Sequence, residues 1–150
     1  MKHSTRLADA VHVLIYIHLD PRGDLRSTAI ATSLATNPAA VRQIMTRLRR
    51  ASLLTSVPGH ARPALAQPPE AITLLDVYRA MDGTAPLLHL DTHTNPHCGA
   101  GVNIQLALQE HYDRIQEAAE AQMQRITIAQ IVADYRQRTA GLTLEVPPLP

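Results

Sequence analysis

Apolar residues recur at helical spacing in six stretches of the chain, near residues 5–18, 28–34, 38–50, 74–82, 102–126 and 128–138. Between the third and fourth stretches, residues 53–57 and 63–66 have the composition of two short strands around a turn at 58–62. This order predicts a mainly α fold with a small β-wing. We expect a winged helix-turn-helix followed by a long C-terminal dimerisation helix.

The stretch at 38–50 carries the clearest functional signal. Asn37 is a preferred N-cap residue, and Pro38 follows at the first helical position, where its missing N–H costs nothing. One face is apolar and consists of Val41, Ile44, Met45 and Leu48. The other face bears arginine, amide and hydroxyl groups and no acid, and arginine and glutamine can read guanine and adenine in a major groove.

We therefore interpret this stretch as the recognition helix, with Ser27 capping the partner helix before it. Base reading is assigned to Arg42, Gln43, Thr46 and Arg47, and wing contacts to His60 and Arg62. The full predicted DNA-binding set is Ser27, Thr28, Asn37, Arg42, Gln43, Thr46, Arg47, Arg49, Arg50, His60 and Arg62. An arginine-rich face is often merely solvated, so a winged module that binds a protein and not DNA remains the alternative.

The charge distribution supports a polyanion partner for the first half only. The net charge of the whole chain is +1, but residues 1–62 carry +6 and residues 63–150 carry −5. No paired carboxylates, nucleophile–base pair or phosphate-cradling glycine loop indicates catalysis, so we expect no enzyme.

The environment is expected to be a reducing cytoplasm. The chain has one cysteine and hence no internal disulfide. Lys2 and Arg6 precede an apolar run, but Asp9, His12 and His18 interrupt it and argue against a signal peptide. No apolar stretch is long enough to span a bilayer, and no membrane partner is expected.

Residues 84–101 are predicted to form a long, sensor-type loop. Cys98 lies just before the long helix, whose N-terminus would favour a thiolate that oxidants can modify. A small buried residue that packs the loop is the competing interpretation of Cys98. A metal-responsive site would use His89, His93, His97 and Cys98, although their spacing does not align them on one helix face. No cofactor or metal is expected.

The long helix is expected to start at about Val102 and to run for roughly 22 residues, or about 33 Å. Such a helix extends beyond a small winged domain, which favours a role in dimerisation. The predicted interface stripe is Ile104, Leu108, Tyr112, Ile115, Ala119 and Met123. The expected organisation is a DNA-binding domain at 1–83, a loop at 84–101, the dimerisation and final helices at 102–138, and a poorly ordered tail at 139–150.

Four motifs together resemble the Rrf-two family of bacterial winged-helix regulators, which includes IscR, NsrR and CymR. They are Asn37-Pro38-x-x-Val41-Arg42, the segment 48–54, the segment 72–80, and Asn95-Pro96-His97-Cys98-Gly99 followed by 127–129. The last is similar to the single-cysteine, YwnA-like branch.

The resemblance implies a homodimeric DNA-binding regulator, usually a repressor, with the long helix at the dimer interface. Twofold symmetry then predicts a palindromic operator. Cluster-binding members carry three cysteines in this loop, so one cysteine argues against an iron–sulfur cluster.

Overall fold

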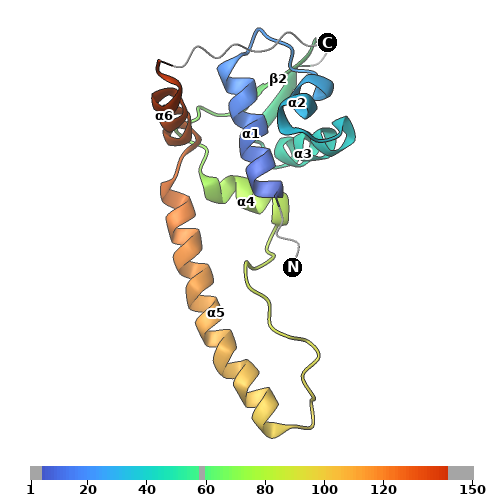
Figure 1. The fold of residues 1–150 in the computed structure, drawn as a ribbon, viewed down its shortest axis with the longest axis vertical. Coiled ribbons are helices and arrows are strands. Elements are labelled where there is room, and N and C mark those ends of the chain that lie inside the picture. The colour runs from blue at the N-terminus through green and yellow to red at the C-terminus, as the bar shows by residue number, and fades with distance from the viewer. Residues whose placement is uncertain (1–4, 58–59, 142–150) are drawn as a thin grey trace.

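The computed structural model describes residues 5–57 and 60–141. Figure 1 shows a cluster of helices and a small sheet from which one long helix projects. The elements in chain order are α1 (Arg6–Leu19), α2 (Ser27–Leu34), α3 (Pro38–Arg50), β1 (Leu54–Val57), β2 (His60–Leu65), α4 (Leu74–Asp82), α5 (Gly99–Arg125) and α6 (Ile128–Thr139). The two strands pair antiparallel, which confirms the predicted mainly α fold with a β-wing.

The helix-turn-helix is formed by α2 and α3. Ala35 adopts a left-handed conformation with φ 50°, which turns the chain after α2. The Asn37 side chain then accepts a hydrogen bond from the Ala40 N–H at 2.8 Å, and Pro38 occupies the first turn. The predicted start of the recognition helix is confirmed.

A single apolar core lies behind the recognition helix. The apolar side of α3 packs against α1 and α4, and Val41 and Leu48 have no exposed surface. The other fully buried large side chains come from α1, α2, α4, α6 and the segment before α4, and they include Val13, Leu14, Ile30, Ile72, Val77 and Ile128.

A backbone junction fixes the C-terminal helices to this core. Thr73 and Thr127 form an isolated antiparallel bridge, with Leu74 N–H donating to Ile126 O at 2.8 Å and Ile128 N–H donating to Ile72 O at 2.9 Å. Each threonine also opens a helix through a complete capping box. The starts of α4 and α6 are therefore held together.

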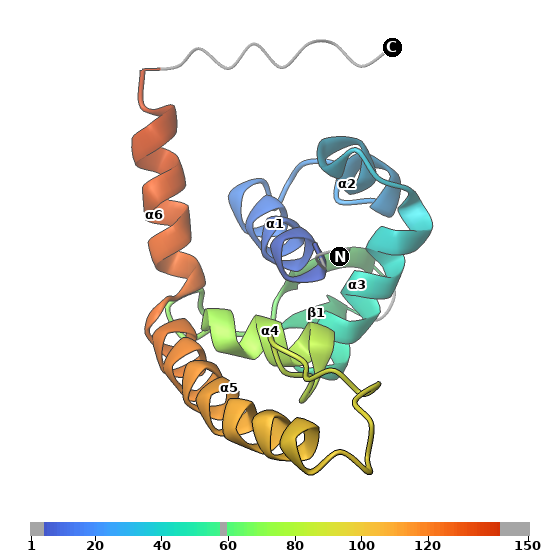
Figure 2. The same cartoon turned by 60° about the horizontal axis from the view of Figure 1, so that its bottom comes forward.

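The long helix α5 has 27 residues and none of them is buried. It begins at Gly99, so the predicted start at about Val102 is wrong by three residues. The reason is that Cys98 occupies the N-cap position and its carbonyl accepts the Val102 N–H at 3.1 Å, although Gly99 and Gly101 are poor helix formers. Figure 2 shows α5 passing beneath α4 before the chain turns into α6.

Three other local predictions need correction. Ser27 is the first residue of α2 and not its cap, because Arg26 takes the N-cap position and its N–H donates to Asp24 Oδ1 at 3.0 Å. The return strand begins at His60, earlier than the predicted 63, and β1 begins at Leu54. Residues 58–59 of the predicted turn and residues 142–150 of the predicted tail lie outside the described residues.

Within the part of the chain that the structure describes, no helix combines the length and apolar character needed to cross a membrane.

Replacing Asn37 by alanine tests the start of the recognition helix. The variant loses the 2.8 Å bond to the Ala40 N–H, so the free energy of unfolding should fall by about 1 kcal/mol. Urea unfolding followed by circular dichroism measures the change. Thr36→Ala, at an exposed neighbouring position, is the control and should leave stability nearly unchanged. Equal midpoints for the wild type and Asn37→Ala would contradict the assignment.

Candidate nucleic-acid interface

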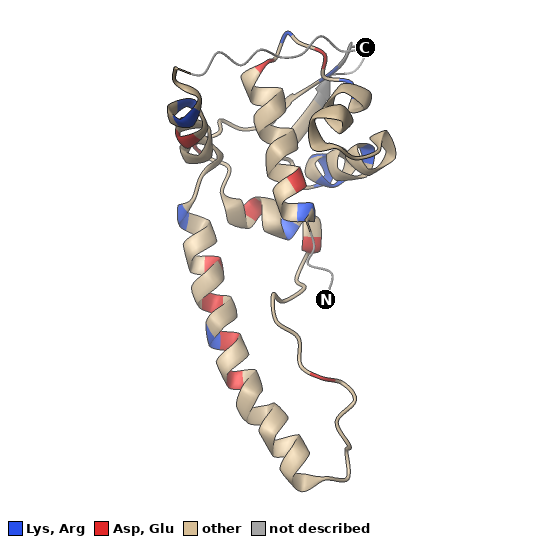
Figure 3. Ribbon diagram, in the orientation of Figure 1, with Lys and Arg blue, Asp and Glu red and all other residues tan. Residues whose placement is uncertain are grey.

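One side of α3 is positively charged and faces solvent. We define the basic front as Arg42, Gln43, Thr46 and Arg49, all of which are exposed. Figure 3 shows basic residues and no acidic residue on α3, and no charged residue on α2. Neither helix of the helix-turn-helix therefore carries a carboxylate that could neutralise the basic front.

The first turn of α2 lies beside the basic front. An Arg42 guanidinium N–H donates to Ser27 Oγ at 3.3 Å, which joins two predicted DNA-binding residues 15 positions apart. Thr46 Oγ1 donates to the Arg42 carbonyl at 2.8 Å and so remains close to its own helix. The side chains of Gln43 and Arg49 make no hydrogen bond or ion pair within the described residues, so their polar groups are available to a partner.

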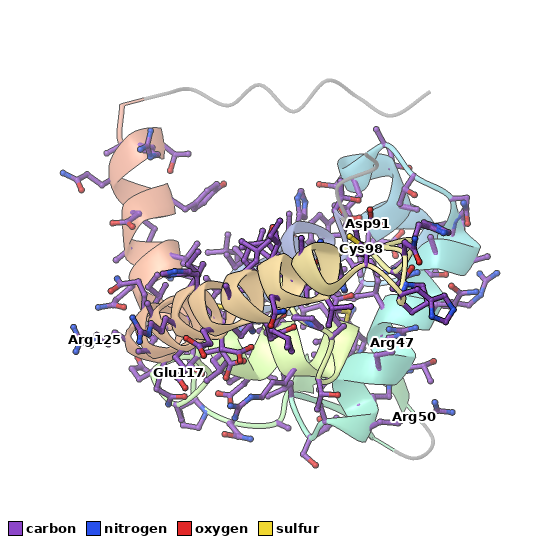
Figure 4. All side chains as sticks on the ribbon, turned by 90° about the horizontal axis from the view of Figure 1, so that it is seen from below. Arg47, Arg50, Asp91, Cys98, Glu117 and Arg125 are labelled. Atoms are coloured by element: carbon purple, nitrogen blue, oxygen red, sulfur yellow. The ribbon has the colours of Figure 1, made fainter. Side chains whose placement is uncertain are left out.

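Two further arginines of the predicted set lie toward α4. The Arg47 guanidinium donates to the carbonyl of Met81, at the C-terminal end of α4. Arg50 lines a cavity with Arg47 at the same junction, and Figure 4 shows both side chains arising from α3. The structure thus divides the predicted set, because the Arg47 guanidinium is bonded to α4 although the residue is exposed.

The wing arginine is also engaged. The two terminal nitrogens of Arg62 donate to the carbonyls of Pro21 at 2.7 Å and Arg22 at 3.2 Å, so β2 is tied to the loop before α2. In that loop, hydrogen bonds from Arg26 lower the pKa of Asp24 to about 2. The side chain of His60 lies outside the described residues. Thr28 is exposed, and the Asn37 side chain serves as the helix cap.

The predicted interface stripe on α5 is divided by its packing against α4. Ile104 and Ile115 are 63% and 49% exposed. The remaining members are half-buried, namely Leu108, Tyr112, Ala119 and Met123. Leu106, which the sequence analysis did not select, is 61% exposed.

A polar contact between α4 and α5 was not predicted. Arg79 pairs with Glu120 at 3.0 Å, and Gln116 donates to the other oxygen of Glu120 at 2.7 Å. These contacts, that of Gln116 first, lower the pKa of Glu120. Gln116 also accepts a hydrogen bond from the Leu87 N–H at 2.9 Å, which ties the loop to α5. The sequence shows only that Gln116 and Glu120 are four residues apart and therefore neighbours on one helix face. It does not show that Arg79 joins them.

Cys98 is exposed at the N-terminus of α5. The interpretation of Cys98 as a buried packing residue is therefore wrong, because the loop lies along the outside of the molecule and does not cover it. Figure 4 shows Cys98 where the loop meets α5. Among the described residues, histidine, cysteine and acidic side chains form no group of three or more that could hold a metal ion.

The Rrf2 family model, described as an iron-dependent transcriptional regulator, matches residues 3–134. YwnA of Bacillus subtilis strain 168, provisionally named an HTH-type transcriptional regulator, is 38% identical over 120 residues, which are 80% of this chain and 89% of YwnA.

Solved structures agree in fold. A crystal structure of a protein provisionally described as DNA-binding is 35% identical, with a TM-score of 0.69, and the match covers 84% of this chain and 97% of that one. CymR of B. subtilis has a TM-score of 0.64 at 22% identity, with 89% of this chain and 97% of CymR covered. IscR of T. potens has a TM-score of 0.67 at 20% identity, with 92% and 90% covered. The chain therefore belongs to the Rrf2 family of winged-helix transcriptional regulators.

Proposed function

We propose that this protein is a homodimeric repressor that binds a palindromic DNA operator through α3 and responds to oxidants through Cys98. The observation that supports DNA binding is the basic front, whose positive charge no acidic residue of α2 or α3 neutralises. Three of its polar side chains, Arg42, Gln43 and Arg49, are exposed on a helix without acids. The N-terminal part of a recognition helix contacts base edges in helix-turn-helix proteins, and Arg42 and Gln43 occupy that part of α3.

The roles of the interface residues follow from their positions. Arg42 and Gln43 suit base edges, since both side chains can form two hydrogen bonds to one base. Arg49 lies seven residues beyond Arg42, on the same side of the helix, and suits a phosphate group. Ser27 and Thr28 lie in the first turn of α2, where backbone N–H groups favour a phosphate.

Substituting Arg42 by alanine should weaken binding to a duplex enriched from random fragments. Loss of a bidentate contact costs about 1–3 kcal/mol, or roughly 5- to 150-fold in affinity. Fluorescence anisotropy at fixed salt measures the change. Arg138→Ala removes an exposed arginine from α6, keeps the same net charge as Arg42→Ala, and should have little effect.

Salt dependence separates this proposal from a winged module that binds a protein. Phosphate contacts release counterions, so DNA affinity should fall steeply between about 50 and 200 mM salt. Equal losses in Arg42→Ala and Arg138→Ala, or no duplex binding at low salt, would favour the protein-binding alternative.

The exposed side of α5 supports the homodimer. A helix of 27 residues is about 40 Å long, and its described residues include none that is buried. Exposed large apolar groups that continue along one element are typical of interaction surfaces. Ile104 and Ile115 are such groups, and their separation of eleven residues puts them on one side of α5. A second copy of α5 would cover them while placing two α3 helices on one duplex.

Replacing Ile115 by glutamate should separate the protomers. A buried, unpaired carboxylate costs several kcal/mol, so the dimer dissociation constant should rise by about a hundredfold or more. Sedimentation velocity over a concentration series measures it. Gln124→Glu is the matched control, because a separation of nine residues puts Gln124 on the opposite side of α5. A wild-type protein that sediments as a monomer would contradict the homodimer.

The position of Cys98 supports the proposed redox response. Its thiol is exposed where the loop enters α5, and peroxide converts a thiolate to a sulfenic acid with release of water or hydroxide. The product is larger and more polar than the thiol. A change at the first turn of α5 would alter how the two DNA-binding domains are spaced.

Cys98→Ser should leave DNA affinity unchanged and abolish its response to peroxide. Operator binding is measured by anisotropy before and after exposure to hydrogen peroxide, with reversal by dithiothreitol as the check on chemistry. Continued sensitivity of the serine variant would remove the sensor role and leave DNA binding intact.

A further inference from the structure

An open cavity of about 610 Å³ lies where three helices meet beside the basic front. The start of α1 and the C-terminal ends of α3 and α4 form its walls. Four arginines line it, Arg6, Arg47, Arg50 and Arg79, together with one acid, Asp82. We refer to it as the arginine cavity.

The cavity keeps an excess of positive charge after its internal contacts are counted. Arg6 lies 3.9 Å from Asp82, and Arg79 pairs with Glu120 at 3.0 Å. The C-terminal ends of α3 and α4 contribute about half a negative charge each. Four guanidinium groups outweigh these charges. The side chain of Arg50 makes no hydrogen bond or ion pair within the described residues, so its guanidinium donors are available.

We propose that the arginine cavity binds a small organic anion with a carboxylate or phosphate group. Guanidinium groups bind carboxylates and phosphates through paired hydrogen bonds. Ala51, Ala80 and Ala85 add apolar surface beside the arginines, which suits the carbon skeleton of a metabolite. The volume is within the range of small-molecule sites, about 300–1,000 Å³.

A regulatory consequence rests on the proposed DNA-binding function. Arg47 belongs to the recognition helix and donates to the Met81 carbonyl of α4. Gly83 ends α4 and also lines the cavity, so the loop toward α5 starts at the site. An anion that draws Arg47 away from Met81 would therefore change the contact between α3 and α4. Anion binding should alter operator affinity.

Thermal unfolding of the full-length protein tests the site without DNA. Inorganic phosphate, pyrophosphate and citrate are titrated separately at constant ionic strength, and at least one should raise the Tm in a saturable manner. Arg50→Gln should weaken that anion by about tenfold or more, since a charge-assisted hydrogen bond is lost. Arg49→Gln is the matched control, because Arg49 is the adjacent arginine of α3 but does not line the cavity.

Two outcomes overturn the site, namely no saturable shift with any of the three anions, or equal weakening by Arg50→Gln and Arg49→Gln. Measuring operator binding by the Arg50→Gln variant adds a third arm to the experiment. If its loss of DNA affinity equals that of Arg42→Ala, Arg50 contacts the DNA backbone and the small-anion site is wrong. Saturable, Arg50-dependent anion binding by a protein that ignores DNA would retain the site and reject the proposed function.

Discussion

Burial of the apolar side of α3 determines where every charged group of that helix lies. Val41 and Leu48 are completely buried against α1 and α4, so α3 cannot rotate without exposing them. Its polar residues are consequently divided between two directions. Arg42 bonds Ser27 of α2 and the Arg49 side chain faces solvent, while the exposed Arg47 bonds the Met81 carbonyl of α4. One packing constraint thus produces both the proposed DNA-binding surface and the arginine cavity.

The sequence predicted those parts of the fold that depend on local interactions. The predicted Asn37 cap is present, and it depends on a bond to a residue three positions away, as do the caps at Thr73 and Thr127. The long-range partners were not predictable in this way. Arg47 bonds a carbonyl 34 positions away, and Arg62 bonds two that are 40 and 41 positions away. Spacing along a helix identifies the side of the helix on which an arginine lies, but it does not identify the distant carbonyl to which that arginine will donate.

The backbone junction between the segments that precede α4 and α6 links the DNA-binding domain to α5. The Thr73–Thr127 bridge holds the C-terminal end of α5 beside the start of α4, and the Arg79–Glu120 pair adds a second contact further along. Among the described residues, the first turn of α5, which follows Cys98, has no such attachment to the core. In the proposed dimer, chemistry at Cys98 would act at the end of α5 that is remote from the junction.

The central claim is that two copies of this chain place two α3 helices on one operator. Native mass spectrometry of the full-length protein with an enriched duplex tests it most directly, because it counts chains per duplex. The account predicts a complex of two chains and one duplex as the main species, with little of the one-chain complex. A dominant complex of one chain per duplex, or free duplex only, would contradict it.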